Sequence, residues 1–491
     1  MLTLRTILAV FLIAGFFLLA LGLAALLIWI PYYSWVYIGV INVKGGALCV
    51  FAALLILSTI WPRREVFLPP GPQLTEDRHP RLFERIRACA KATNSEMPRA
   101  VYLVPQLNAW VSRRGGFLLR GGEPILGLGA PLLAILTTSQ LTAVLVHEFG
   151  HEAGGDVRFG GWIYGTRIKL LRAAGEFGSL RDHWLSVLKF PFLLYSRLFV
   201  GVTAAVSRHQ ELRADELSGR IAGSSAAISA LRAIHAGDPA YERFLAADFG
   251  PLLERGFRPP LVEGFRTFFG RLSPEKDFPE LLKAAEAAAG RSKDDTHPPL
   301  HVRVERLQTL PDAPKSAEDS PAIDLLDWDP TFEKDIVARM SNHTVARRAT
   351  PISWQELGTD AGCCRVFLSE REQLYKSTAP GLRGITPLHL AELAKDPEAF
   401  GRRLTPQKMF SQAYAGLASA AIGTGLLLAL RARGWTLKRE PGRALLVCKG
   451  DHAVEADALL PHLRDGRISA DEWAQRCRDY GIADVDLGAV R

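Results

Sequence analysis

Two long apolar runs at the N-terminus constrain the fold more than any other feature of this chain. Residues 6–30 carry no charged side chain, and a helix of that length can cross a bilayer. A second uncharged run covers residues 45–61, and the neutral aromatic stretch 31–35 is typical of a membrane interface. A cleavable signal peptide is shorter and is not followed by a second run. The sequence therefore predicts a transmembrane hairpin within residues 1–64.

The charges that flank the hairpin predict its orientation. Arg5 precedes the first run, Arg63 and Arg64 follow the second, and the turn between the runs has no charge before Lys44. Because basic residues gather on the cytoplasmic side, both ends of the hairpin are expected there. Lys44 is the one residue that departs from this pattern. We expect a multi-pass membrane protein with its large C-terminal portion on the cytoplasmic side.

The overall charge and the cysteines exclude some classes of protein. The chain has 491 residues with 59 Lys and Arg against 51 Asp and Glu, a net charge of +8 that suits an anionic membrane surface. Basic and aromatic residues are not interleaved in a way that would indicate a nucleic-acid partner. The six cysteines form no C-x-x-C pair, so neither a disulfide framework nor a cysteine zinc site is expected.

Polar, proline-containing stretches divide the rest of the chain. They predict linkers at 65–80 and 311–325, which would separate a catalytic domain at 81–310 from an accessory region at 326–491. The pattern of the segments between them predicts a mainly α fold with a small β-sheet, of the α+β class. The accessory region is expected to be α+β as well.

Within the catalytic domain, residues 99–104 are expected to form a strand and residues 115–128 a hairpin with glycine-rich turns. Two further apolar segments need a decision between membrane and core. The segment 184–206 is interrupted by basic residues, and we expect a buried helix of the catalytic domain rather than a third membrane contact. The segment 413–430 is rich in Gly and Ala and is expected to be a packed helix of the accessory region.

The pentapeptide that begins at His147 carries the strongest chemical signal. Its two histidines, His147 and His151, are four residues apart and lie on one face of a helix, so both imidazoles can reach one ion. Glu148 lies at the edge of the same face, where it can hold a water molecule without being a ligand. This H-E-x-x-H pattern is that of zinc metallopeptidases. A pair of surface histidines on an ordinary helix is the alternative.

The surrounding sequence supports a helix at this place. Thr137 and Gln140 have the spacing of a capping box, which marks a helix N-terminus. Apolar residues follow at helical spacing, and Gly154-Gly155 ends the run. The motif is therefore expected on one amphipathic helix of about four turns.

A catalytic zinc site needs a third protein ligand and an open position for water. The best candidate is Glu211, with Asp215 one turn later on the same helix face. Asp215 could accept the far N–H of a ligand imidazole and so fix its tautomer. Because E-x-x-x-D is a common pattern, a solvated helix face is the alternative for this pair.

Several motifs now stand in a specific order along the chain. They are Asn108-Ala109-Trp110, Ile125 to Leu128 with Pro131-Leu132-Leu133, Ser207 to Asp215, and Thr296-His297-Pro298-Pro299 with Arg303 and Leu307. With them, residues 82–307 resemble the HtpX-like branch of the membrane-anchored zinc metallopeptidases, gluzincin-type relatives of the CAAX prenyl endopeptidases. Members of that family often have four or more spans, whereas only two are clear here.

The resemblance implies roles for further residues. Asn108 and Ala109 would bind the substrate backbone, since an edge strand can pair with an extended peptide. His297 would donate to the oxyanion of the tetrahedral intermediate, although a capping or core histidine is the alternative. Arg303 would be a structural partner for an acidic residue near the site.

The predicted activity is hydrolysis of internal peptide bonds in protein or peptide substrates with one Zn²⁺ per chain. His147, His151 and Glu211 would hold the ion, and Glu148 would act as the general base. The resemblance suggests a role in quality control of membrane or misfolded proteins, with the catalytic domain on the cytoplasmic side of a bacterial inner membrane. Two alternatives stay open: an intramembrane metalloprotease, and a membrane-tethered scaffold whose zinc is structural.

Overall fold

The structure is a computed structural model. It describes residues 2–40, 42–61, 67–114, 122–153, 166–167, 169–175, 187–272, 277–289, 298–312, 319–340, 348–358, 363–438, 440–443 and 445–490. The fold is mainly helical with small sheets, as predicted. The contacts between residues group the chain into two units, one of Met1–Ala240 with Ser273–Met340 and one of Tyr241–Leu272 with Ser341–Arg491.

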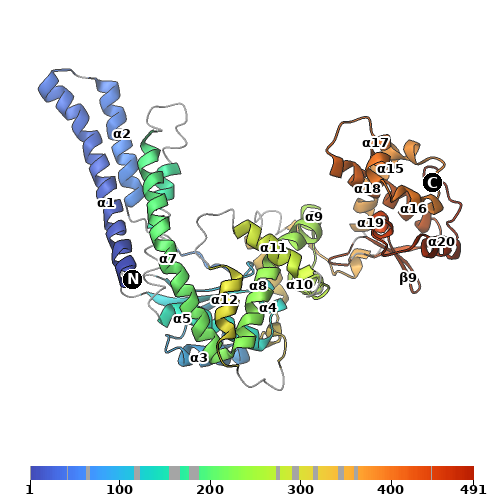
Figure 1. The fold of residues 1–491 in the computed structure, drawn as a ribbon, viewed down its shortest axis with the longest axis horizontal. Coiled ribbons are helices and arrows are strands. Elements are labelled where there is room, and N and C mark those ends of the chain that lie inside the picture. The colour runs from blue at the N-terminus through green and yellow to red at the C-terminus, as the bar shows by residue number, and fades with distance from the viewer. Residues whose placement is uncertain are drawn as a thin grey trace. The chain divides into compact units, whose positions relative to one another are not determined.

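The first unit begins with the predicted helical hairpin. Helix α1 (Leu2–Tyr33) continues into a π-helical turn, η1 (Ser34–Ile38), and helix α2 (Val43–Ile60) returns beside it (Figure 1). Small residues such as Ala20 and Ala52 are fully buried between the two helices, while large apolar side chains such as Phe11 point outward. This distribution suits helices that face lipid on the outside and each other on the inside.

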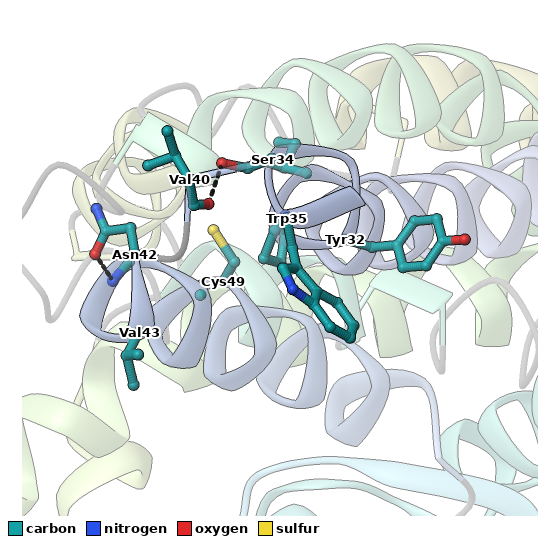
Figure 2. Close-up of a pocket in the computed structure, with 11 residues that line it drawn as sticks. Tyr32, Ser34, Trp35, Val40, Asn42, Val43 and Cys49 are labelled. Atoms are coloured by element: carbon teal, nitrogen blue, oxygen red, sulfur yellow. Dashed lines mark hydrogen bonds between the residues drawn. The ribbon is translucent and has the colours of Figure 1, made fainter. Parts of the chain in front are cut away.

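A pocket of about 560 Å³ lies at the turn of this hairpin (Figure 2). It is lined by the end of α1, the η1 turn and the first residues of α2. The turn is closed by local hydrogen bonds, in which Ser34 Oγ donates to Val40 O at 3.0 Å and Gly45 N donates to Asn42 Oδ1 at 2.9 Å. The described residues that line the pocket are apolar, aromatic or uncharged polar residues.

Helix α7 (Lys189–Ala222) corrects one sequence prediction. The helix predicted at 184–206 is present from Lys189, and residues 184–186 lie outside the described residues. The first half of α7 is not buried within the catalytic domain. Phe192 and Phe199 pack in one apolar cluster with α1 and α2, and α7 runs beside α1 (Figure 1). On the other face, Leu194 is 71% exposed. Apolar periodicity alone cannot distinguish a face that contacts lipid from one that contacts a protein core.

Four helices in the described part of the chain are long and apolar enough to cross a membrane. They are the helices at Ile7–Ile38, Val43–Ile60, Lys189–Ala222 and Ala413–Arg431. The first three pack together, whereas the last belongs to the other unit. The helix with the two motif histidines is not among them.

A four-stranded sheet follows the hairpin in the first unit. Its strands are β1 (Gln73–Leu74), β2 (Ala100–Val104), β3 (Ala109–Arg114) and β4 (Glu123–Gly129), in the order β1-β2-β4-β3. Only β2 and β4 are parallel. The strand predicted at 99–104 is confirmed by β2. Of the predicted hairpin at 115–128, the second strand is confirmed by β4, which pairs antiparallel with β3. Residues 115–121 of the predicted hairpin lie outside the described residues.

The remaining elements of the first unit are helical. They are α3 (Pro80–Ala92), α4 (Ala130–Ile135), α5 (Thr138–Ala153), most of α8 (Ser224–Phe244), α11 (Asp277–Ala289), α12 (Leu300–Gln308), the 3₁₀ turn η4 (Ala322–Leu325) and α13 (Pro330–Met340). Two segments predicted as linkers contribute to this unit, since 65–80 contains β1 and 311–325 contains η4. Helices α5 and α7 pack directly against each other, which brings distant parts of the sequence together.

The second unit has its own apolar core around helix α18 (Ser411–Arg431). Ala418, Ile422 and Leu426 of this helix are fully buried. The structure therefore favours the packed helix predicted at 413–430. The other elements are η3 (Leu245–Phe249), α9 (Gly250–Glu254), β5 (Phe257–Arg258), α10 (Leu261–Gly270), β6 (Thr350–Pro351), η5 (Glu356–Gly358), α15 (Cys363–Leu382), η6 (Pro387–His389), α16 (Leu390–Leu393), α17 (Pro397–Leu404), β7 (Thr436–Lys438), β8 (Leu446–Lys449), β9 (His452–Glu455), α19 (Leu459–Arg464) and α20 (Ala470–Asp479).

The two units do not coincide with the predicted domains. Residues 241–272, which were assigned to the catalytic domain, group with the C-terminal residues, and residues 319–340 stay with the first unit. That residues 81–310 and 326–491 are separate domains, each of which folds independently, remains a prediction.

Candidate metal centre

Helix α5 carries the two motif histidines, and its N-terminus forms as predicted. The backbone N–H of Thr137 donates to Gln140 Oε1 at 2.9 Å, and the N–H of Gln140 donates to Thr137 Oγ1 at 3.4 Å. This reciprocal pair is the predicted capping box. It satisfies two backbone donors at the start of the helix, so the motif follows on a regular helix.

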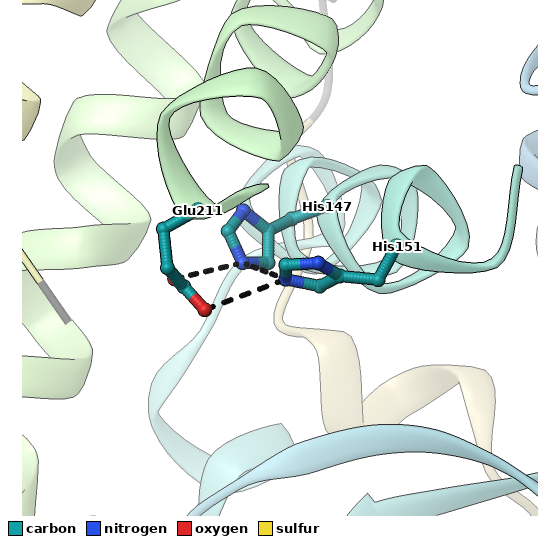
Figure 3. A group of neighbouring side chains, drawn as sticks. All are labelled: His147, His151 and Glu211. Carbon is teal, nitrogen blue, oxygen red and sulfur yellow. Dashed lines mark hydrogen bonds and ion pairs between the residues drawn. The ribbon is translucent and has the colours of Figure 1, made fainter. Parts of the chain in front are cut away.

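The side chains of His147, His151 and Glu211 converge on one point (Figure 3). The two Nε2 atoms lie 3.2 Å apart. Glu211 Oε2 lies 3.6 Å from His147 Nε2, and Oε1 lies 3.5 Å from His151 Nε2. Neighbouring ligand atoms around a tetrahedral Zn²⁺ are roughly 3.3 Å apart, given bonds of about 2.0–2.1 Å. The donor set and its spacing therefore fit a zinc ion.

Close packing of α5 on α7 makes this convergence possible. A Cβ atom at Gly150 would lie 3.4 Å from the Cα atom of Ala214, so the two helices approach closely at the motif itself. About two turns earlier on α5, the carbonyl of Ala143 accepts a hydrogen bond from Ser218 Oγ at 2.7 Å. Together these contacts hold Glu211 opposite the two histidines.

A buried ion pair lies behind the first histidine. Asp215 Oδ1 is 3.1 Å from His147 Nδ1, which directs the Nε2 atom of this imidazole towards Glu211. Arg303, on α12, donates from Nε and Nη2 to the two oxygens of Asp215 at 2.7 and 2.6 Å. Asp215 is 3% exposed and Arg303 is 5% exposed. A carboxylate in this position fixes the tautomer of a ligand histidine and increases its basicity.

The carboxylates around His147 attract positive charge. Burial disfavours the charged form of His147, but hydrogen bonds to Asp215 and Glu211 outweigh it and raise the pKa of this imidazole to about 10. Burial raises the pKa of Glu148, and this effect is larger than the opposite, lowering effect of the nearby charges of His147 and His151. The negative charge that favours a proton on His147 also favours a metal cation at this place. Glu148, as a carboxylate with a raised pKa, is suited to accept a proton near neutral pH.

The strand at the edge of the sheet lies next to this cluster. Gly129 N donates to Asn108 O at 2.8 Å, so Asn108 faces β4, and by strand alternation the amides of Ala109 and Val111 face the open side. The N–H of Ala109 is bonded to Asn108 Oδ1 at 2.9 Å. The N–H of Val111 donates to the carboxylate of Glu148. The edge strand and the predicted base are therefore in direct contact.

An ion pair that the sequence did not reveal ties this strand to α5. Arg113 Nε donates to Glu152 Oε1 at 2.9 Å, and Arg113 Nη1 donates to Gly122 O at 2.9 Å. Arg113 also pairs with Glu96. Glu152 directly follows His151, but nothing in the sequence indicates that its partner is on β3. The pair holds the C-terminal end of the metal helix against the edge strand.

Some predicted residues cannot be placed. Thr296 and His297 lie outside the described residues, and α12 with Arg303 begins three residues after His297. The role predicted for His297 therefore remains a prediction. Of the remaining predicted residues, those on α5, α7 and α12 meet at one site, with Asn108 and Ala109 at the start of the neighbouring strand.

Residues 76–310 match the model of peptidase family M48. The chain carries an M48 peptidase domain. It is similar to the protease HtpX of Sodalis glossinidius, with 26% identity over 46% of this chain and 72% of that protein. It is 26% identical to the HtpX homologue of Nitrosomonas europaea over 46% of this chain and 70% of that protein, and 25% identical to HtpX of Escherichia coli K12 over 48% and 75%. No solved structure matches the chain.

The M48 domain and the apolar helices decide between the alternatives. The protein is a membrane-anchored metalloprotease of the HtpX-like type, as the sequence predicted. A scaffold without enzymatic activity does not agree with this family. An intramembrane protease would need its motif helix to be one of the spans, but α5 is not among the candidate spans of the described residues.

Proposed function

We propose that this M48 peptidase hydrolyses internal peptide bonds of protein substrates with one Zn²⁺ ion held by His147, His151 and Glu211. The convergence of their three ligand atoms, at spacings of 3.2 to 3.6 Å, carries this proposal. A zinc ion in such a site lowers the pKa of a water molecule and polarises a carbonyl group. Three protein ligands leave one position open, as in catalytic rather than structural zinc sites.

Glu148 has the position of the general base. Its carboxylate lies beside the two histidines and against the edge strand, and burial raises its pKa, which makes it a stronger base. In the proposed reaction, Glu148 accepts a proton from the attacking water and passes it to the leaving amine. Asp215 accepts a hydrogen bond from the Nδ1–H group of His147. This bond would keep Nε2 directed at the ion.

The substrate is proposed to bind as an additional strand on β3. The outward amide of Ala109 would pair with an extended peptide, which is the usual way to recognise a backbone at a sheet edge. The outward amide of Val111 is already bonded to Glu148. The Asn108 side chain now occupies the N–H of Ala109, and it would turn to the substrate backbone when a peptide binds. His297 is proposed to donate to the oxyanion of the tetrahedral intermediate.

The course of helix α7 supports the proposal that the substrate lies close to the membrane. Leu198 is 54% exposed on the apolar half of this helix, and Glu211 follows on the same unbroken helix. Their separation of thirteen positions corresponds to roughly 20 Å at 1.5 Å per residue. A site this close to the bilayer suits segments of membrane proteins, and we propose quality control of membrane or misfolded proteins as the role.

Removal of the metal should abolish hydrolysis, and zinc should restore it. Because His147 keeps a proton up to a pKa of about 10, zinc must displace that proton when it binds. We therefore expect the apparent zinc affinity of the chelated protein to increase about tenfold per pH unit below that value. The measurement is zinc uptake against a competing chelator between pH 6 and 9, with hydrolysis of an unfolded protein followed in parallel.

The metal-free protein offers an internal control on this pH dependence. Charged His147 stabilises the metal-free fold below its ordinary pKa of 6.5, and this stabilisation is lost as the pH rises towards about 10. The melting temperature of the metal-free form should therefore fall over this range, while that of the zinc form changes less. Full activity after complete removal of metal would refute the proposed chemistry.

The catalytic side of the membrane is proposed to be the cytoplasm. Arg5 at the start of α1 and the basic pair 63–64 after α2 support this orientation. In inverted bacterial inner-membrane vesicles, a membrane-impermeant cross-linker should trap substrates on a Glu148→Gln form. In vesicles of the native orientation it should trap none. The opposite result would place the cleft on the other side.

A further inference from the structure

A segment outside the M48 match contacts and holds the N-terminus of helix α5, which carries His147 and His151. Residues 319–327, called here the strap, follow the matched region, which ends at residue 310. The strap pairs with the chain around Thr137, where Thr138 N donates to Ser320 O and Ala322 N donates to Leu136 O, both at 2.8 Å. These bonds lie directly before the first turn of α5.

Asp319 is the strap residue that contacts α5 most closely. Its Oδ1 accepts hydrogen bonds from Ser139 N at 2.8 Å and from Thr138 Oγ1 at 3.0 Å, and its Oδ2 accepts from Ser139 Oγ at 2.6 Å. Partial burial would raise the pKa of Asp319, but the bonds from Ser139 and its neighbours outweigh this and lower it. The carboxylate is therefore charged at neutral pH and lies at the positive end of the helix dipole.

The strap is itself anchored in the first unit. Ala322 is fully buried, and Leu325 and Leu326 are 6% and 8% exposed. Asp327 N donates to His79 Nδ1 at 3.1 Å, just before α3. The strap therefore connects the N-terminus of α5 to the α3 side of the unit rather than hanging from the helix.

This arrangement matters because the metal ligands come from two helices. His147 and His151 lie on α5, whereas Glu211 lies on α7, which packs with the membrane hairpin. A shift of α5 along or around its axis would change both histidine positions relative to Glu211. Functional groups of this kind must be held to about 0.5 Å, so the anchor of α5 bears directly on the site.

We propose that Asp319 is a positioning residue of the metal centre, which acts through α5 and not by contact with the metal or substrate. The proposal rests on the proposed zinc site. Ser139 and His147 are eight residues apart on α5, or roughly 12 Å, so Asp319 can influence the ligands only by fixing the helix. The sequence around Asp319 had indicated no more than a polar linker.

The test uses the full chain in lipid nanodiscs with Asp319→Ala and Asp319→Asn. We expect Asp319→Ala to weaken zinc retention against a competing chelator about fivefold or more, with Asp319→Asn between it and the unchanged protein. The visible absorption of Co²⁺ bound in place of zinc reports coordination geometry and should change in Asp319→Ala. Unchanged retention and an unchanged Co²⁺ spectrum in both variants would overturn the proposal.

A matched control separates positioning from general stability. Asp396 caps α17 in the second unit by accepting from Ala399 N at 2.9 Å, so Asp396→Ala removes a similar cap far along the chain. Its zinc retention and Co²⁺ spectrum should stay unchanged, and an equal loss in this variant would also overturn the proposal. If the unchanged protein failed to bind zinc, the proposed function would fail instead, which is a distinct result.

Discussion

Replacing Glu148 with Gln should reduce peptide hydrolysis by about 100- to 10,000-fold, the usual contribution of a general base. The amide has nearly the same shape as the carboxylate but cannot accept the proton. Because Glu148 is not one of the three converging ligands, the zinc content should stay near one ion per chain. The measurement is kcat/KM on an unfolded protein substrate, together with metal analysis of the same sample.

Two comparison variants sharpen this result. Asn108→Ala should raise KM more than it lowers kcat, because it removes a contact to the substrate backbone. His297→Ala should lower kcat by about 100-fold or more if it donates to the oxyanion. Glu148→Gln with near-normal hydrolysis would remove this residue from the mechanism. Loss of zinc in that variant would show that its effect is structural.

Replacing Arg303 with Met should have the largest effect on stability. Arg303 is buried and makes two hydrogen bonds to Asp215, so its removal leaves a buried carboxylate without its cation. Breaking such a pair costs about 3–5 kcal/mol in the free energy of unfolding. Because Asp215 also orients His147, we expect zinc affinity to fall about 10- to 100-fold. Thermal unfolding and chelator competition measure the two effects.

The chain contains a suitable control for this substitution. Arg371 makes the same type of paired contact with Asp457 in the second unit, but there the side chains are 24% and 26% exposed. Arg371→Met should therefore cost less stability and leave zinc affinity unchanged. The double variant Arg303→Met with Asp215→Asn should recover part of the lost stability, since it removes the unpaired charge. No recovery would mean that Arg303 acts mainly through its packing.

Several features could be predicted because they depend on residues close together in the sequence. The capping box of Thr137 and Gln140 forms as expected, and the spacing of His147 and His151 places both imidazoles on one face of α5. The hairpin of α1 and α2 follows from two uncharged runs. In each case the period of a helix and the chemistry of its ends determine the outcome locally.

Other predictions failed or stopped short because their answer lies in contacts between distant segments. The helix at 184–206 was expected in the catalytic core, but its first half packs on the membrane hairpin. Part of the segment expected as a linker at 311–325 docks on the metal helix instead. The local sequence in these places is compatible with either environment, so only packing partners decide.

The sequence by itself determined the metal helix, the membrane hairpin and the candidates for the third ligand and its support. Only the tertiary structure decided that Glu211 lies 3.5 and 3.6 Å from the two histidines, and that Arg303 forms an ion pair with Asp215. It also revealed the pair of Arg113 with Glu152 and the bond from Asp319 to α5. Helical periodicity acts within a few residues, whereas these contacts depend on how α5, α7, α12, the edge strand and the strap pack together.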